Sequence, residues 1–330
     1  MFSVLITGGA GFIGSHLTEL FLNKNYNVIV VDNFSTGKLS NFNSIKNNKN
    51  LEIHDIDILD LDNLKKIFVK IDFVIHLAGI AEIVPSIDNP SSYFDVNVRG
   101  TLNLLELSKN CNIKKFIYAA SSSSYGIPKE YPTKENAIIN PQYPYALTKY
   151  MGEELVINWN KIYKLPSISL RFFNVYGPKS RTSGTYGAVM GVFLAQKLAN
   201  KPLTIVGDGT QTRDFTYVTD VCEAIFAACI SKAEGEVINI GSENTYSINK
   251  LVKLIGGKTV NIPKRPGEPD CTWADITKAK KILKWSPKIS FEEGISKLLE
   301  NINYWKDAPI WDEKKIEAAT KKWFEYLNDR

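Results

Sequence analysis

A glycine-rich stretch near the N-terminus constrains the fold of this chain more than any other feature. Residues 7–14 read Thr-Gly-Gly-Ala-Gly-Phe-Ile-Gly, after an apolar run and before a segment with helical spacing of apolar residues. Glycines in this context allow a tight turn and a close approach of the backbone to a pyrophosphate. The pyrophosphate then lies at the helix N-terminus, where N–H groups and the dipole favour negative charge. The pattern predicts a dinucleotide site formed by Gly8, Gly11, Phe12, Ile13 and Gly14.

The acidic residue at the end of the next apolar run bears on the choice of cofactor. Asp32 comes about 20 residues after the glycines, where a carboxylate can accept hydrogen bonds from both ribose hydroxyls. It favours NAD, because it would repel the 2′-phosphate of NADP and no Arg occurs in residues 33–37. Lys38 could in principle meet a phosphate, so NADP is disfavoured but stays open. The following residues expected to contact the cofactor are Asn33, Ser35, Thr36 and Gly37.

Short apolar runs alternate with helix-like stretches through the first half of the chain. The runs at residues 4–6, 28–31, 73–77 and 116–119 read as buried strands, and apolar residues recur at helical spacing over residues 12–22. This alternation predicts an α/β fold, a doubly wound parallel sheet of the Rossmann type. Pro and Gly breaks in the second half indicate a smaller C-terminal substrate-binding α/β domain. We expect the NAD-binding domain at residues 1–173, with a later return of the chain to it left open, and the substrate domain at 174–330.

Composition and charge exclude several classes of protein. With 330 residues and 44% hydrophobic side chains, the chain can bury a full core. The net charge of +5 is spread over Lys residues mixed with Asp and Glu, unlike the basic block of a nucleic-acid binder. No run of about 18 apolar residues occurs, and the N-terminus lacks the layout of a signal peptide. We therefore expect a cytoplasmic protein with no membrane or nucleic-acid partner.

The cysteines do not indicate a metal or disulfide site. Cys111, Cys222, Cys229 and Cys271 show no C-x-x-C pairing and no nearby histidine cluster. We interpret them as structural thiols that an intracellular protein keeps reduced, and we expect no metal.

Tyr145 and Lys149 form a second pattern with chemical meaning. Their i,i+4 spacing on a predicted helix places the phenol and the ammonium on one face. Nearby positive charge favours phenolate, so Lys149 and an oxidised nicotinamide should lower the pKa of Tyr145 and make it a general base. The serine run at residues 121–124 follows a buried strand, and open α/β sheets place ligands at strand ends. The Ser121 hydroxyl is therefore expected to bond the reacting alcohol and share its proton with Tyr145.

These motifs together resemble the extended short-chain dehydrogenase/reductases, and specifically the NAD-dependent epimerase/dehydratase family. The resemblance extends over roughly residues 1–300. Besides Tyr145 and Lys149, the cofactor contacts that it implies are Asp57 and Ile58 around the adenine, Leu77, Ala78 and Gly79 beneath the cofactor, Asn97 on the helix that steadies the catalytic loop, and Phe173 over the nicotinamide.

The same resemblance implies a substrate diphosphate site in the second half. Arg213 and Arg265 lie in stretches similar to the family's two arginine-bearing loops, and a guanidinium fork suits a diphosphate. Thr272 resembles a position where a bulky side chain excludes an N-acetyl group and a small one admits it; simple packing in a loop is an equal alternative. The substrate contacts implied are Ser121, Ser122, Ser123, Tyr145, Asn174, Ala188, Val189, Thr204, Arg213, Arg265, Glu268 and Thr272.

The serine loop separates the reactions that this family carries out. Its 4,6-dehydratases have an Asp and a Glu at the positions of Ser122 and Ser123, and its decarboxylases have a Glu at the position of Ser123; neither carboxylate is here. The resemblance therefore implies 4-epimerisation of UDP-Glc/UDP-Gal or UDP-GlcNAc/UDP-GalNAc. Tyr145 takes the 4-OH proton, tightly bound NAD accepts the C4 hydride, and the 4-keto sugar swings over before the hydride returns.

Two alternatives to this reaction stay open. One is another reaction of the family, namely 4-epimerisation of a UDP-uronic acid, a dehydration or a reductase step. The other is a non-catalytic NAD-binding sensor, although such proteins typically lack the Tyr or the Lys.

The chain continues beyond the usual end of the resemblance. In residues 305–330, the positions of Trp311, Ile316, Ala319, Trp323 and Tyr326 predict an added amphipathic helix, either a clasp over the core or part of an interface. By resemblance, a homodimer is expected, through a four-helix bundle built from the helix after Asn97 and the Tyr145 helix.

Overall fold

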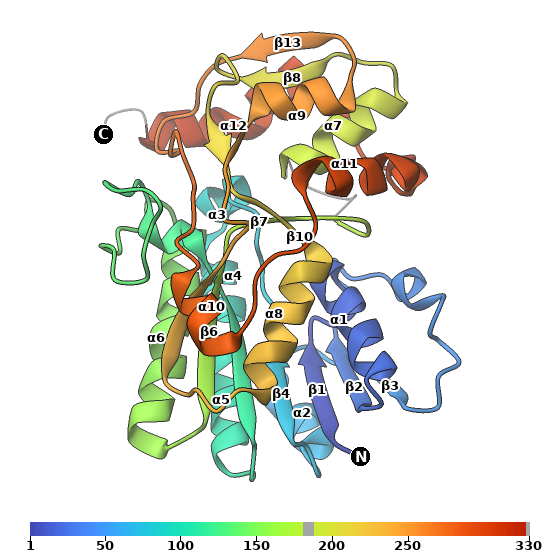
Figure 1. The fold of residues 1–330 in the computed structure, drawn as a ribbon, viewed down its shortest axis with the longest axis vertical. Helices are drawn as coiled ribbons and strands as arrows, with labels where there is room; N and C mark the ends of the chain where they lie inside the picture. The colour runs from blue at the N-terminus through green and yellow to red at the C-terminus, as the bar shows by residue number, and fades with distance from the viewer. Residues whose placement is uncertain (181–187, 328–330) are drawn as a thin grey trace.

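A seven-stranded parallel sheet forms the lower part of the molecule in Figure 1, in a computed structural model that describes residues 1–180 and 188–327. The strand order is β11-β6-β5-β4-β1-β2-β3, so the chain winds outward in both directions from β1. This confirms the predicted doubly wound α/β fold. The strands are β1 (Ser3–Thr7), β2 (Asn27–Asp32), β3 (Leu51–Asp55), β4 (Phe73–His76), β5 (Lys115–Ser121), β6 (Ser167–Phe172) and β11 (Glu236–Ile240).

Helices cover both faces of this sheet because its strands are apolar on both sides. In β1, Val4 and Ile6 join the layer that contains Leu17 of α1, whereas Leu5 joins the layer that contains Leu104 of α5. Helices α1 and α8 pack together, as do α5 and α6. The helical elements of this part are α1 (Phe12–Asn23), η1 (Leu39–Phe42), α2 (Leu61–Ile67), α3 (Val84–Asp88), α4 (Pro90–Phe94), the π-helical turn η2 (Asp95–Arg99), α5 (Gly100–Lys109), η3 (Ser122–Tyr125), α6 (Pro144–Tyr163) and α8 (Val218–Ile230).

Short strand pairs and helices make up the upper lobe. β7 pairs with β10 and β8 with β13 in parallel, and β9 pairs with β12 antiparallel. The other elements of this lobe are β7 (Asn174–Tyr176), α7 (Val189–Leu198), β8 (Leu203–Val206), β9 (Thr212–Arg213), β10 (Phe215–Tyr217), β12 (Tyr246–Ser247), α9 (Ile248–Ile255), β13 (Thr259–Ile262), α11 (Phe291–Glu300), η4 (Ile302–Trp305) and α12 (Glu313–Leu327). Helix α10 (Thr277–Leu283) lies in the lower part instead, where it contacts β11 and α8 (Figure 1).

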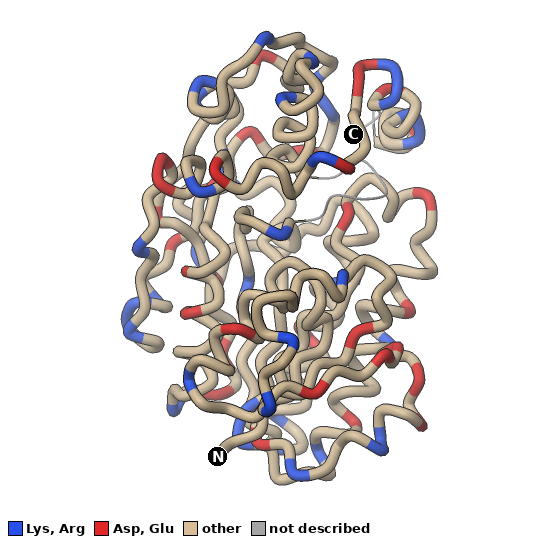
Figure 2. Tube along the Cα trace, turned by 90° about the vertical axis from the view of Figure 1, so that its right-hand side faces the viewer, with Lys and Arg blue, Asp and Glu red and all other residues tan. Residues whose placement is uncertain are grey.

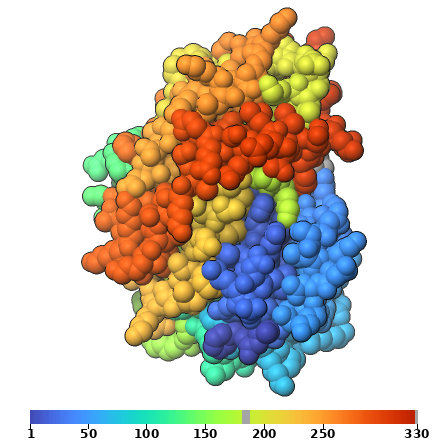
Figure 3. Space-filling view, turned by 45° about the vertical axis from the view of Figure 1, so that its right-hand side comes forward, coloured from blue at the N-terminus to red at the C-terminus, as the bar shows by residue number. Residues whose placement is uncertain are grey.

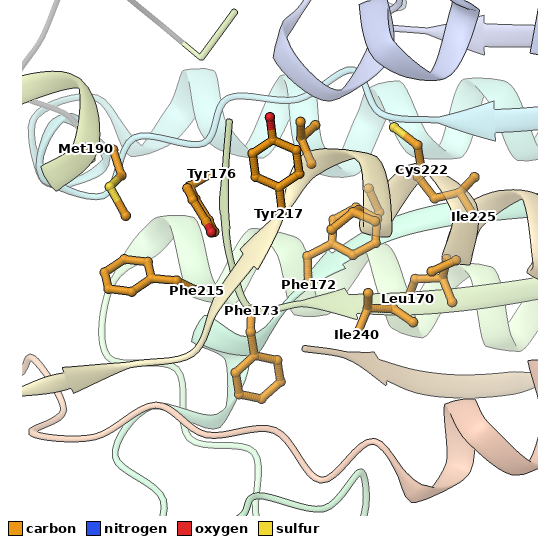
Figure 4. Packing of buried hydrophobic residues seen from close by; sticks show 14 of the residues in the cluster. Leu170, Phe172, Phe173, Tyr176, Met190, Phe215, Tyr217, Cys222, Ile225 and Ile240 are labelled. Carbon is orange, nitrogen blue, oxygen red and sulfur yellow. The ribbon is translucent and has the colours of Figure 1, made fainter. Parts of the chain in front are cut away.

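Aromatic side chains join the two parts into one apolar core. The Tyr176 ring of β7 packs against those of Phe215 and Tyr217, with 6.0 and 5.4 Å between centroids, in the same cluster as Phe172 of β6 (Figure 4). The Phe215 ring stacks on Phe291 of α11, with 5.2 Å between centroids and 7° between planes. Figure 3 shows the red segment that contains α11 as a band between the blue N-terminal region and the upper lobe.

The chain returns to the sheet after its first visit to the upper lobe. β11 pairs with β6, and α8 packs on α1, although both follow residue 173 in the sequence. The two parts are therefore connected by several crossings rather than by one linker.

The C-terminal helix forms as predicted but with a different buried face. Ile316 and Trp323 of α12 are buried, and Ala319 packs partly against the core. Trp311 lies before the helix begins, and Tyr326 is 60% exposed, so neither belongs to its buried face. Leu327 takes that place because it follows Trp323 by four residues, one helical turn.

The distribution of charge fits an ordinary solvated surface. Basic and acidic residues are interspersed along both parts of the trace in Figure 2. Among the described residues, no helix has both the length and the apolar character needed to cross a membrane. The four cysteines are free thiols.

Candidate active site

The glycine turn places the start of α1 close to the end of β1. Gly8 has φ +69°, a conformation that glycine adopts without strain. A Cβ at Gly14 would lie 2.2 Å from the Gly8 carbonyl oxygen, so only glycine fits there. α1 begins at Phe12 with Gly11 before it, and no side chain caps its first turn. The N–H groups at this end therefore suit an anionic ligand such as a pyrophosphate.

Asp32 lies at the end of β2, beside this turn. Its carboxylate accepts hydrogen bonds from the backbone N–H groups of Ala10 and Phe34, each at 2.9 Å. Burial raises the pKa of Asp32, and these two bonds oppose the rise. A Cβ at Gly37 would meet both carboxylate oxygens at 2.9 Å, so the loop after β2 folds back onto Asp32. Lys38 directs its Nζ over the Tyr304 ring, 5.6 Å from the centroid.

The residues expected around the adenine lie together beyond the ends of β2 and β3. Asn33 donates from Nδ2 to the Asp57 carboxylate at 2.7 Å, and the Ser35 N–H donates to the Asn33 side-chain oxygen at 3.1 Å. Ile58 packs against Gly100, where a Cβ would lie 2.4 Å from its Cδ1. Thr36 is exposed next to Ser35. These contacts bring residues 33–37 and 57–58 to one side of the glycine turn.

Asn97 connects the turn after β4 with α6. It is buried within the π-helical turn η2, a feature often found at functional sites. Its Oδ1 accepts from the Ile80 N–H at 2.9 Å, and its Nδ2 donates to the Thr148 hydroxyl at 3.2 Å. A Cβ at Gly79 would lie 3.7 Å from the Lys149 Nζ. Leu77, Ala78 and Gly79 are thus held next to the predicted catalytic helix.

Lys149 is buried one helical turn after Tyr145 on α6. Its Nζ lies 4.4 Å from the centroid of the Tyr118 ring. Burial lowers the pKa of Lys149 to about 7, while the negative charge of Glu153 opposes the shift. The ammonium is therefore held in balance with the neutral amine close to neutral pH.

The pKa of Tyr145 departs from the sequence-based expectation. Burial raises it, and a hydrogen bond with the Ser121 hydroxyl lowers it by a smaller amount. The predicted lowering by Lys149 is not found in the protein alone, because desolvation of the phenolate outweighs the favourable interactions there.

The serine loop presents hydroxyl groups at the end of β5. Ser121 and Ser123 share a hydrogen bond between their Oγ atoms at 2.8 Å, and the Ser123 N–H donates to Ser121 Oγ at 3.2 Å. Ser124 is turned back, donating to the Ser121 carbonyl at 2.8 Å. Ser121, Ser122 and Ser123 are each partly exposed, and Ser121 faces Tyr145.

Sequence reasoning missed a buried ionic network behind this site. Arg171 of β6 forms an ion pair with Glu153 of α6, and its Nη1 donates to the Tyr125 hydroxyl at 2.8 Å. The same hydroxyl donates to Asn239 at 2.7 Å. Glu153 follows Lys149 by four residues, so helical spacing would have placed its carboxylate on the same face as the predicted catalytic pair.

In the upper lobe, two arginines converge on one carboxylate. The Arg265 Nη1 lies 3.0 Å from Glu268, and the Arg213 Nη2 lies 3.8 Å from it. Burial lowers the pKa of Arg213, while Glu268 raises it. Two guanidiniums around one carboxylate leave an excess of positive charge, which suits a doubly charged anion.

Asn174 and Thr272 also meet in this region. Thr272 donates from its hydroxyl to the Asn174 side-chain oxygen at 2.8 Å and accepts from the Asp214 N–H at 3.1 Å. Asp214 is itself buried, and burial raises its pKa to about 6. The Thr272 hydroxyl is therefore engaged with protein partners.

The structure does not bring every expected residue to this surface. Thr204 is buried and its hydroxyl accepts from Gln196 at 2.9 Å, because β8 turns this side chain toward α7. Phe173 is buried, with its ring centroid 6.4 Å from that of Tyr125. Ala188 and Val189 lie at the start of α7. No group of three or more potential metal-binding side chains occurs within residues 1–180 and 188–327.

The residues present fit a dinucleotide. The glycine turn leaves space that a Cβ would fill, Asp32 presents a carboxylate at the end of β2, and Lys149 lies beyond the end of β4. This fold and site define the class as an α/β enzyme that holds a dinucleotide beside a partly buried tyrosine and a buried lysine.

Comparison with known proteins identifies the family. The family model described as GDP-mannose 4,6 dehydratase matches residues 5–298. A putative UDP-glucose 4-epimerase of Methanocaldococcus jannaschii is 39% identical, over 90% of this chain and 97% of that protein. A UDP-glucuronate 4-epimerase of Thermodesulfobacterium geofontis is 38% identical, over 95% and 97%.

A solved structure agrees with this assignment. The UDP-glucuronic acid 4-epimerase from Bacillus cereus, in complex with UDP-glucuronic acid and NAD, is 37% identical with a TM-score of 0.85 and covers 92% of this chain and 99% of its own. The chain belongs to the NAD-dependent epimerase/dehydratase family of nucleotide-sugar enzymes. Its cofactor is NAD.

Proposed function

We propose that this protein is a UDP-hexose 4-epimerase, acting on UDP-Glc/UDP-Gal or on UDP-GlcNAc/UDP-GalNAc. The observation that carries the proposal is the contact of Ser121 with Tyr145, which has buried Lys149 one turn further along α6. Ser121 belongs to a loop that has serines where the dehydratases of the family carry carboxylates. One base and one hydride acceptor are enough for 4-epimerisation, and a second acid is not needed.

In this mechanism Tyr145 and Ser121 handle the proton of the sugar 4-OH. The Tyr145 phenolate takes the proton while Ser121 bonds the same oxygen, and NAD, when bound, supplies the acceptor for the C4 hydride. The resulting 4-keto sugar turns its other face to the site, and Tyr145 returns the proton as the hydride comes back. The Lys149 ammonium stabilises the phenolate that this cycle requires.

We further propose that one part of the molecule binds the cofactor and the other binds the UDP moiety of the substrate. Residues 1–173, with α8 and β11, hold the cofactor through the glycine turn, Asp32 and residues 33–37 and 57–58. The upper lobe, within residues 174–330, grips the UDP moiety with Arg213, Arg265 and Asn174. A homodimer in the cytoplasm is the state in which we expect this enzyme to act.

A UDP-glucuronate 4-epimerase is the second candidate. It is favoured by the similarity to the T. geofontis and B. cereus proteins, which bear that name. It requires the same Tyr145 and Ser121 chemistry, with a C6 carboxylate in place of the alcohol.

The test is to incubate the purified chain, without added cofactor, with UDP-Glc, UDP-GlcNAc and UDP-GlcA in turn, and to follow the anomeric protons by NMR. Appearance of the matching 4-epimer identifies both the reaction and the substrate. No conversion of any of the three, even after NAD is added, would contradict both candidates and point to a reductase or to a non-catalytic role.

A further inference from the structure

The C-terminal helix α12 lies outside the part of the chain that the family model covers, which ends at residue 298. Its buried face consists of Ile316, Thr320, Trp323 and Leu327. Of these, Trp323 is only 1% exposed. What this face covers therefore indicates what the additional segment does.

Trp323 contacts two regions that the proposed reaction uses. Its indole Nε1 donates to the Pro266 carbonyl oxygen at 2.8 Å. Its ring lies 5.4 Å from that of Tyr143, at 47° between planes. Tyr143 directly precedes α6 and is two residues before Tyr145. One side chain thus joins the loop that carries Arg265 to the start of the catalytic helix.

The loop that α12 covers has little regular structure to hold it. Between β13 and α10, residues 263–276 form only isolated bridges. Leu327 adds a second contact, since a Cβ at Gly267 would lie 3.7 Å from its Cδ1. A loop ordered before binding loses less entropy when it grips a ligand than a loop that must be ordered by it.

Two polar contacts connect α12 and the segment just before it to the rest of the molecule. Lys322 pairs with Asp88 of α3 at 3.0 Å, on the side of the cofactor-binding part. At the other side, the Gln196 side chain of α7 donates to the Trp311 carbonyl at 2.6 Å. The helix and the segment leading into it therefore contact both parts of the molecule, across the region in which Arg265 and Tyr145 would meet one substrate.

We propose that α12 is a positioning element for nucleotide binding, in which Trp323 holds the Arg265 loop against the head of α6 so that the Arg265 guanidinium is preset for the substrate diphosphate. This inference rests on the proposed function. Trp323 acts through Arg265 and does not itself touch the substrate.

The experiment measures the affinity of the full-length chain for UDP by calorimetry, with NAD content as a separate readout. Trp323→Ala should weaken UDP binding by about tenfold or more, since small displacements of a gripping residue are costly. Trp323→Phe keeps an aromatic ring against Tyr143 but loses the hydrogen bond to Pro266. Its UDP affinity should lie between those of Trp323→Ala and the unmodified chain. Tyr326→Ala removes an exposed aromatic ring from the same helix and should bind UDP as the unmodified chain does.

A double-mutant cycle with Arg265→Ala separates positioning from a general loss of structure. If Trp323 acts through Arg265, then Trp323→Ala should change UDP affinity little once Arg265 is gone, while NAD content stays the same. Equal effects in both backgrounds, or unchanged UDP affinity in folded Trp323→Phe and Trp323→Ala, would overturn the inference. If the unmodified chain does not bind UDP at all, the proposed function falls as well.

Discussion

The environment of Lys149 opposes the charge that its proposed role requires. Because the pKa of Lys149 falls to about 7 in the folded protein, its charged form is disfavoured relative to the unfolded chain. The resulting cost in stability is complete below about pH 7 and disappears as the pH rises toward the ordinary lysine pKa of about 10.4. We predict that Lys149→Met raises the free energy of unfolding and abolishes epimerisation.

The test compares urea unfolding of Lys149→Met and the unmodified chain at about pH 6 and at about pH 9.5. The increase in the free energy of unfolding caused by the substitution should be larger at the lower pH. Lys161→Met, on the exposed end of the same helix, provides the control and should show no such dependence on pH. A Lys149→Met variant that is less stable at both values would mean that the ammonium is well solvated or well paired.

Loss of the Tyr145 hydroxyl should stop the chemical step without affecting the fold or the binding of NAD. Tyr145→Phe should lower kcat by roughly two or more orders of magnitude, the usual contribution of a general acid or base, while NAD binding persists. Turnover is measured by NMR and NAD by absorbance of the denatured protein. Turnover equal to that of the unmodified chain would remove Tyr145 from the mechanism.

Thr272 provides a test of substrate choice. Thr272→Tyr should reduce kcat/KM for UDP-GlcNAc relative to UDP-Glc by about 10- to 200-fold, because a large ring would fill the space for the N-acetyl group. Thr272→Val removes the hydroxyl that bonds Asn174 without adding bulk, and serves as the control. If both variants shift selectivity equally, the hydroxyl rather than the size of the side chain sets the preference.

Sequence spacing could predict Tyr145 and Lys149 because both lie on one helix. It could not predict the direction of the Tyr145 pKa, since that depends on how deeply the phenol is buried by distant elements. Thr204 shows a similar limit: the residue lies in the expected segment, but its orientation is set by Gln196 on a neighbouring helix.

At the scale of elements, the start of α1 should be sensitive to a single methyl group. Gly14→Ala would bring a Cβ within 2.2 Å of the Gly8 carbonyl oxygen, so the helix must move away from the turn. We predict a loss of bound NAD and a lower melting temperature. Asn23→Ala, at the exposed far end of the same helix, should retain NAD. Full NAD content in Gly14→Ala would show that the turn tolerates this shift.

The elements that the sequence predicted are those with local signals. Apolar runs identified β1, β2, β4 and β5 to within a few residues, and the glycine turn located the start of α1. The network of Arg171, Glu153 and Tyr125 was missed because it joins β6, α6 and η3 through contacts between residues far apart in sequence. No periodic pattern records such a contact.

At the level of the whole molecule, α6 presents exposed apolar side chains that could pair with a second copy in the expected homodimer. Leu147 and Ile162 are 48% and 57% exposed on this helix. We predict that light scattering during gel filtration gives the mass of a dimer, and that Ile162→Glu shifts it toward the monomer. Ile230→Glu, at an equally exposed apolar position on α8, should leave the mass unchanged. A monomer in the unmodified chain would contradict the expectation.

The return of the chain to the sheet at β11 has a consequence for dividing this protein. β6 is an internal strand only because residues 236–240 pair with it. A fragment that stopped at residue 173 would expose the backbone of β6 as an open edge, and open edges recruit strands from other molecules. Such a fragment would aggregate, and during synthesis the nascent sheet can be closed by its last strand only after residues 174–240 have emerged.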